Sequence, residues 1–266
     1  MQPTISNKIF AYLSSLGVDR VFLVPGGGNM FLVDAAGSET GIEFVPTHHE
    51  QAAVIAAEYY ARRTGRLGVA LVTTGPGSTN AITGISGAWL DSIPVLILAG
   101  QVKTADYNFD QDLRQKGPQE IDLVSMVKNV TKFAKTCFDA DTVLDDVMNA
   151  VKAALGGRPG PAVLEVPLDV QSRINDAEIS ASQDDGQADE PELQSRLETC
   201  VSDIVEALRE AERPVIISGF GVKCAGQSDN LRQLIEAKDL PVALTWPMAD
   251  FLPFDHRLNC GRFGVV

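Results

Sequence analysis

The chain has 266 residues, of which 45% are hydrophobic and 21% are charged, and its formal net charge at pH 7 is -13. This composition is typical of a globular protein, and the negative charge disfavours nucleic acid as a partner, because phosphate binding needs clustered lysine and arginine. No apolar run approaches the roughly 20 residues that span a bilayer, and no secretory signal is visible at the amino end, so we expect a cytoplasmic protein with no membrane partner.

Short apolar runs alternate with longer amphipathic segments in the first part of the chain. The runs predict buried strands over residues 21–24, 69–72, 95–98 and 162–166. Helical spacing predicts helices over residues 5–16, 50–63 and 142–155. This alternation predicts an α/β domain over residues 1–170, with a doubly wound, mostly parallel sheet and helices on both faces.

A composition change then marks a second region. Residues 171–192 are acidic and poor in large apolar side chains, which predicts an exposed linker. Beyond it, patterning predicts two helices, over 193–209 and 230–237, and two strands, over 214–218 and 241–245. Two strands and two helices are too few to close a doubly wound sheet, so we expect 193–266 to be the amino-terminal part of an incomplete α/β domain.

The four cysteines are scattered and form no Cys-x-x-Cys pair. This spacing disfavours a zinc site or a disulfide framework, and it predicts reduced, mostly buried thiols.

Glu50 stands where a predicted strand passes into a predicted helix. A glutamate in the first turn of a helix is favourable on electrostatic grounds alone, because the helix dipole is positive there. The small side chains of Ala52, Ala53 and Ala56 also let a flat ligand approach, and a carboxylate facing a crevice can exchange a proton with a ligand nitrogen. Both interpretations stay open at this point. His49 can orient a ligand, whereas adjacent histidines rarely bind one metal ion.

Two glycine-rich turns each follow a predicted strand. Gly26-Gly27-Gly28-Asn29 exposes backbone amides at a helix start, where they can bind an anion, but it lacks the Gly-x-Gly-x-x-Gly spacing of a dinucleotide site. The turn over residues 75–80 lacks the Gly-Lys-Ser/Thr ending of a phosphate-binding loop. It is either a tight turn or a ligand-contacting loop. Gln101 also follows a strand, at a position that faces the crevice of such a sheet.

Together these motifs resemble the amino-terminal pyrimidine-binding domain of thiamine-diphosphate enzymes. The resemblance rests on three motifs in order: Val24-Pro25-Gly26-Gly27-Gly28-Asn29, His49-Glu50-Gln51-Ala52-Ala53, and Thr74-Gly75-Pro76-Gly77 with Asn80. Four further motifs narrow it to the acetolactate synthase-like branch: Asp91-Ser92-Ile93-Pro94, Gly100-Gln101-Val102, Gln119-Glu120, and Gly157-Arg158-Pro159-Gly160-Pro161. The second region resembles the beginning of that family's central domain.

The resemblance implies a role for each matching residue. Glu50 would hydrogen-bond the aminopyrimidine ring of thiamine diphosphate and, with Gln101 and Gln119, form the catalytic set. The implied cofactor contacts are Gly27, Gly28, His49, Pro76, Gly77 and Asn80. The implied reaction decarboxylates a pyruvate-like 2-oxo acid and transfers the enamine to a second carbonyl, whose identity stays open.

The matching sequence leaves part of such an enzyme unaccounted for. In the family a third domain holds magnesium and the diphosphate, and no matching motif occurs here, so we expect no metal ligand in this chain. A homo-oligomer, or a hetero-oligomer with a chain carrying the carboxyl-terminal half, would complete the site. FAD is a further cofactor of the family that this sequence does not support. The alternative is a non-catalytic remnant or assembly module of the same fold.

Overall fold

The computed structural model describes residues 2–109, 113–175 and 191–263. The chain divides into two compact units, Met1–Asp184 and Asp185–Val266. Most of the predicted linker, residues 176–190, lies outside the described residues. The predicted domain limits at 170 and 193 therefore stay predictions.

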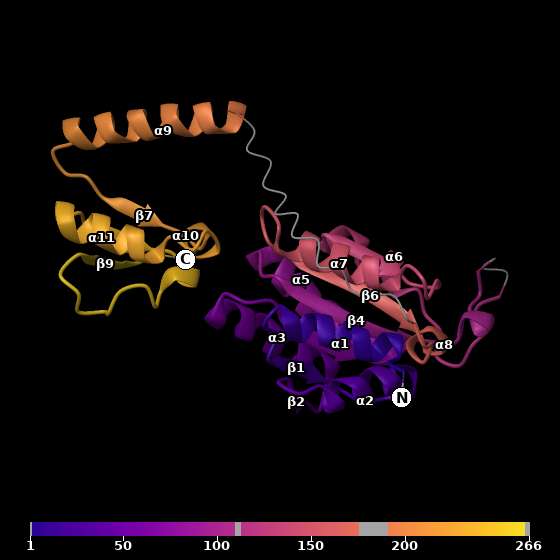
Figure 1. Cartoon of the computed structure of the whole chain (residues 1–266). Helices are drawn as coiled ribbons and strands as arrows, with labels where there is room; N and C mark the ends of the chain where they lie inside the picture. Colours follow the sequence, from indigo (N-terminus) through magenta and orange to yellow (C-terminus); the bar gives the residue numbers. More distant parts are fainter. Residues whose placement is uncertain (1, 110–112, 176–190, 264–266) are drawn as a thin grey trace. The chain divides into compact units, whose positions relative to one another are not determined.

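The first unit is built on a six-stranded parallel sheet (Figure 1). Its strands are β1 (Arg20–Leu23), β2 (Glu43–Pro46), β3 (Gly68–Val72), β4 (Val95–Gln101), β5 (Phe133–Thr136) and β6 (Pro161–Pro167). They lie in the order β2-β1-β3-β4-β6-β5, and every neighbouring pair is parallel. Because β1 pairs with both β2 and β3, the chain changes direction across the sheet at β1, and ligands bind at such switch points beyond the strands' carboxyl ends.

Helices cover both faces of this sheet. They are α1 (Ile5–Ser15), α2 (Met30–Ser38), α3 (Glu50–Thr64), α4 (Pro76–Asn80), α5 (Ile82–Asp91), α6 (Leu123–Val127), α7 (Val143–Leu155) and α8 (Leu168–Gln171). Three single-turn helices are also present: η1 (Gly27–Asn29), η2 (Thr104–Asp106) and η3 (Lys128–Val130). The doubly wound α/β fold predicted from the sequence is confirmed.

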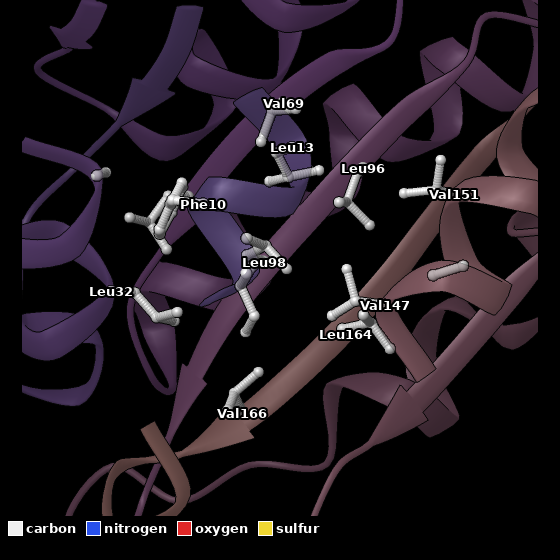
Figure 2. Close-up of a cluster of buried hydrophobic side chains, with 14 of the residues drawn as sticks. Phe10, Leu13, Leu32, Val69, Leu96, Leu98, Val147, Val151, Leu164 and Val166 are labelled. Carbon is white, nitrogen blue, oxygen red and sulfur yellow. The ribbon is translucent and has the colours of Figure 1, made fainter. Parts of the chain in front are cut away.

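A large apolar core fills one side of the sheet. Phe10 and Leu13 of α1, Leu32 of α2 and Val147 of α7 pack against alternate strand residues such as Leu98 (Figure 2). Each of these five side chains has 0% relative exposure. On the opposite face, α3 contacts β1, β3 and β4 and also packs against α5. Burying both faces holds the strands rigidly, so the loops at their carboxyl ends are fixed in place.

The second unit contains a three-stranded parallel sheet, β7-β8-β9. Its elements are α9 (Pro191–Glu210), β7 (Ile216–Ser218), α10 (Gly221–Cys224), α11 (Ser228–Lys238), β8 (Val242–Leu244), η4 (Trp246–Met248) and β9 (Asn259–Arg262). The prediction of only two strands and two helices here was wrong. The strand β9 was missed because its residues Asn259-Cys260-Gly261-Arg262 are all partly or fully exposed and carry no apolar pattern.

The prediction of mostly buried thiols was also wrong. Cys137 is buried after β5, whereas Cys200, Cys224 and Cys260 are exposed, and none of the four forms a disulfide within the described part of the chain. The exposed three belong to the second unit, where fewer elements are available to cover them.

Candidate active site

The glycine-rich turn after β1 is organised by the buried Asn29. Its Oδ1 accepts a hydrogen bond from the Gly26 amide (2.8 Å), and its Nδ2 donates to the Val24 carbonyl (3.1 Å). The Gly28 amide donates to Thr73 Oγ1 of the next loop (3.1 Å). A β-carbon added at Gly28 would lie 1.9 Å from Thr74 Oγ1, so only glycine fits between the two loops.

Glu50 begins α3 and is almost fully buried, with 9% relative exposure. His49 is the N-cap of this helix, and its Nδ1 accepts a hydrogen bond from the Gln51 amide (3.1 Å). Asn80, at the end of α4, donates from Nδ2 to Glu50 Oε2 (2.9 Å). The second oxygen, Oε1, faces Gly77, where an added β-carbon would lie 3.0 Å from it. One carboxylate oxygen is therefore held by an amide, while the other lies beside a residue with no side chain.

The loop after β3 connects this carboxylate with the glycine turn. Thr73 receives the Gly28 hydrogen bond on its hydroxyl, and its methyl carbon would lie 2.5 Å from a β-carbon added at Gly77. The next residue, Thr74, has only 5% relative exposure, and its hydroxyl has no hydrogen-bond partner among the described residues. A buried hydroxyl without a partner is costly, so this group favours a bound ligand or water.

A pocket of about 300 Å³ opens beside Thr74 at the carboxyl ends of β1, β3 and β4. Its lining residues are Gly27, Gly28, Thr74, Gln101, Val102, Lys103, Asp106, Pro118, Gln119 and Leu168. The structure therefore brings four of the predicted site residues, Gly27, Gly28, Gln101 and Gln119, to one pocket.

The segment that carries Gln119 folds back over the sheet edge. Gln119 has a φ of +62°, and its carbonyl oxygen would lie 2.3 Å from a β-carbon added at Gly75, which itself has a φ of +65°. Glu120 accepts hydrogen bonds from the backbone amides of Asn108 (2.6 Å), Lys116 (2.8 Å) and Gly117 (3.0 Å). Although burial of this carboxyl acts in the opposite direction, these three backbone donors lower the pKa of Glu120. The Glu120 carboxylate thus connects the two described parts of this loop, which lie before and after residues 110–112.

The predicted site residues fall into two groups joined by Thr73 and Thr74. Glu50, Gly77 and Asn80 form the first, and the four pocket residues form the second. His49 is exposed and caps its helix, and Pro76 occupies the first turn of α4 with its ring exposed. The sequence analysis assigned no role to Thr73, and it included Thr74 only as part of a matching motif. The one feature that could have indicated both residues is their position directly after a buried strand.

The described residues lack two further kinds of feature. They contain no group of three or more His, Cys, Asp or Glu side chains arranged to hold a metal ion. No helix among them is both long enough and apolar enough to cross a membrane.

Fold and site together define a doubly wound α/β protein. A pocket lies at the carboxyl edge of its parallel sheet, and a buried carboxylate lies one loop away. Residues 3–126 match the family model for the thiamine pyrophosphate enzyme, N-terminal TPP binding domain, and residues 201–266 match the model for the thiamine pyrophosphate enzyme, central domain. The chain belongs to the thiamine pyrophosphate enzyme family.

Curated relatives extend the same similarity over nearly the whole chain. The acetolactate synthase large subunit of Lactococcus lactis is 34% identical over 98% of this chain. Acetolactate synthase isozyme 3 large subunit of Escherichia coli is 34% identical over 94%, and the chloroplastic acetolactate synthase of Arabidopsis thaliana is 32% identical over 95%. The aligned parts cover 44%, 42% and 37% of the lengths of these three relatives, so the chain spans less than half of each.

Proposed function

We propose that the first unit binds the pyrimidine end of thiamine diphosphate and supplies the glutamate that exchanges protons with its ring. The observation that carries this proposal is the asymmetric environment of Glu50. Its Oε2 accepts a hydrogen bond from the Asn80 amide, whereas its Oε1 lies beside Gly77, so close that a β-carbon at that residue would lie 3.0 Å from it. A carboxyl group that is nine-tenths buried and held on one oxygen is suited to proton transfer from the other.

The residues in hand fit the cofactor that the family implies. Glycine at residue 77 lets the start of α4 approach Glu50 and Thr73 closely, and the Thr74 hydroxyl lacks a partner among the described residues. Pro76 and Asn80 would lie against the ring, and His49 would hold the start of α3 that presents Glu50. When bound, thiamine diphosphate supplies an electron sink for the decarboxylation of a 2-oxo acid.

The proton movement is assigned to Glu50 Oε1. Because Oε2 already accepts from Asn80 Nδ2, a proton on the carboxyl group resides on Oε1, where it can be donated to a ring nitrogen and taken back. The low exposure of the Glu50 side chain limits its contact with bulk water.

The pocket beside Thr74 is the proposed place for the substrates. We infer a pyruvate-like 2-oxo acid and a second carbonyl as acceptor, in keeping with the names of the relatives. Thr74 and Gln119 offer neutral hydrogen-bonding groups, and Lys103 offers a positive charge for a carboxylate.

Full activity on this proposal needs a segment outside these 266 residues. The diphosphate and its magnesium would be held by that segment, either further along the same protein or on a partner subunit of a homo-oligomer or hetero-oligomer. The second candidate function is a non-catalytic assembly module of the same fold.

The test combines the chain with the carboxyl-terminal part of the Lactococcus lactis relative and measures pyruvate consumption with thiamine diphosphate and magnesium. Glu50→Gln should lower the rate by about 10²- to 10⁴-fold, the range typical of a lost general acid–base group. Glu43→Gln is the matched control, since this exposed glutamate forms a surface ion pair with Arg20. Equal rates for the two variants would exclude the assigned role of Glu50, and no rate with the unaltered chain would favour the assembly module.

A further inference from the structure

A buried carboxyl group lies directly behind the pocket wall. Glu165, near the carboxyl end of β6, has 0% relative exposure. Its Oε1 accepts a hydrogen bond from Gln101 Nε2 (2.9 Å), and its Oε2 accepts one from Thr136 Oγ1 (2.7 Å). The backbone amide of Leu123 also donates to it. One side chain therefore joins the ends of three neighbouring strands to the start of α6.

Both the nitrogen and the oxygen of the Gln101 side-chain amide are hydrogen-bonded. Its Nε2 donates to the Ile121 carbonyl (2.8 Å) as well as to Glu165, and its Oε1 accepts from the Val102 amide (2.9 Å). Turning the amide over would place its oxygen against the Glu165 carboxylate and the Ile121 carbonyl, and its NH₂ against the Val102 amide. All three contacts would then be repulsive, so Glu165 helps to specify a single orientation.

The charge of Glu165 is costly for the fold. Burial raises the pKa of Glu165 to about 7, and its hydrogen-bonding partners Gln101, Thr136 and Leu123 are uncharged. The titratable groups that face it are Asp122 at the start of α6, Tyr107 after η2 and Cys137 after β5, and none of these is a cation. A neutral glutamine or an apolar side chain would fill the same space at lower cost, so packing alone does not account for a carboxyl group here.

We propose that Glu165 is a positioning residue for the pocket. It fixes the Gln101 side chain in the pocket wall, and together with Gln101 it holds the segment 119–123, whose first residue, Gln119, also lines the pocket. The connection has two parts, because Gln101 holds the Ile121 carbonyl while Glu165 holds the Leu123 amide. This inference rests on the proposed function only for what the pocket binds; the positioning itself does not depend on the cofactor.

Hydrogen exchange of the full chain tests the positioning locally. The Val102 amide is protected by Gln101 Oε1, so its protection factor reports whether the Gln101 side chain stays in place. Glu165→Leu should lower protection at Val102 roughly tenfold, the value expected for one lost hydrogen bond, while Leu98 in the middle of β4 stays protected. Glu165→Gln should retain the protection, because its amide oxygen can still accept from Gln101.

Thr136→Val is the matched control, since it removes a Glu165 partner without touching Gln101. It should leave protection at Val102 unchanged. The proposal is overturned if Glu165→Leu keeps Val102 protected, or if Glu165→Gln loses as much protection as Glu165→Leu.

A second measurement needs no substitution and covers the case in which Glu165→Leu does not fold. In the unaltered chain, the NMR signals of the Gln101 side-chain NH₂ group should shift with pH with the same midpoint as the Glu165 carboxyl carbon. In Glu165→Gln that shift should vanish. A Gln101 signal that does not follow the Glu165 titration would overturn the proposal, whereas absence of thiamine diphosphate binding would count only against the proposed function.

Discussion

At the residue scale, two adjacent glycines of the turn after β1 provide a direct test of the site geometry. Neither has a positive φ, so they differ mainly in the space around them. A β-carbon at Gly27 would meet nothing within 4 Å, whereas one at Gly28 would lie 1.9 Å from Thr74 Oγ1. Gly28→Ala should cost about 1–3 kcal/mol in free energy of unfolding, and Gly27→Ala about 0.5 kcal/mol or less. Urea denaturation measures both, and equal costs would contradict the described contact between the two loops.

The raised pKa of Glu165 gives a pH dependence of stability whose sign is fixed. In the unfolded chain the carboxyl group has its ordinary pKa of 4.5, and in the folded protein the pKa is about 7. Its contribution to stability is therefore fully present below pH 4.5 and is lost as the pH rises through 7. Relative to Glu165→Gln, the unaltered chain should lose on the order of 3 kcal/mol between these limits. A stability difference that is constant with pH would show that Glu165 does not titrate in this range.

At the element scale, substitutions of His49 at the start of α3 distinguish a helix-capping role from a ligand-binding role for this residue. Its Nδ1 satisfies the Gln51 amide, one of the free donors at the helix start. His49→Ala should destabilise the first unit by about 0.5–2 kcal/mol, and His49→Asn should restore stability, because asparagine is a preferred N-cap. Urea unfolding curves of the two variants measure these changes in stability. If Asn restores stability but thiamine diphosphate binding stays impaired in a reconstituted complex, His49 also contacts the ligand.

Sequence patterns predicted the elements that are buried on both sides. The predicted strands at 69–72 and 95–98 correspond to β3 and β4, whose residues are all buried and therefore apolar throughout. The edge strand β5 was missed, because Phe133-Ala134-Lys135-Thr136 is only partly buried and pairs on one side alone. The helix α5 was missed because Gly84, Ser86 and Gly87 interrupt its apolar pattern.

The candidate site was predictable only where its residues follow strands. Glu50 and Gly77 lie in the first turns of helices that follow strands, and Gln101 is the last residue of β4, so their shared edge of the sheet follows from the fold class. The link through Thr73 depends on side-chain contacts between loops that are distant in sequence. Glu165 lies inside an apolar strand, and nothing in the run Ala162-Val163-Leu164-Glu165-Val166 indicates that its carboxyl group meets Gln101.

At the scale of the whole molecule, the two units differ in the size of their sheets and in the candidate site residues that they contain. The first contains a complete six-stranded sheet, and its carboxyl edge carries both the Glu50 group and the pocket. The second has three short strands, and α9 leaves Leu197, Val201 and Ile204 exposed at helical spacing. The matched relatives are more than twice as long as this chain. The function proposed for these residues is that part of an active site which the Glu50 group and the pocket form.

The central claim is that these residues bind the pyrimidine end of thiamine diphosphate through Glu50. It is tested most directly by calorimetric titration of thiamine diphosphate and magnesium into the chain, alone and together with the carboxyl-terminal part of the Lactococcus lactis relative. We expect binding with both parts present, weakened by Glu50→Gln and unaffected by Glu43→Gln, and little binding to the chain alone. Absence of binding in every combination, or binding that Glu50→Gln leaves unchanged, would contradict the account.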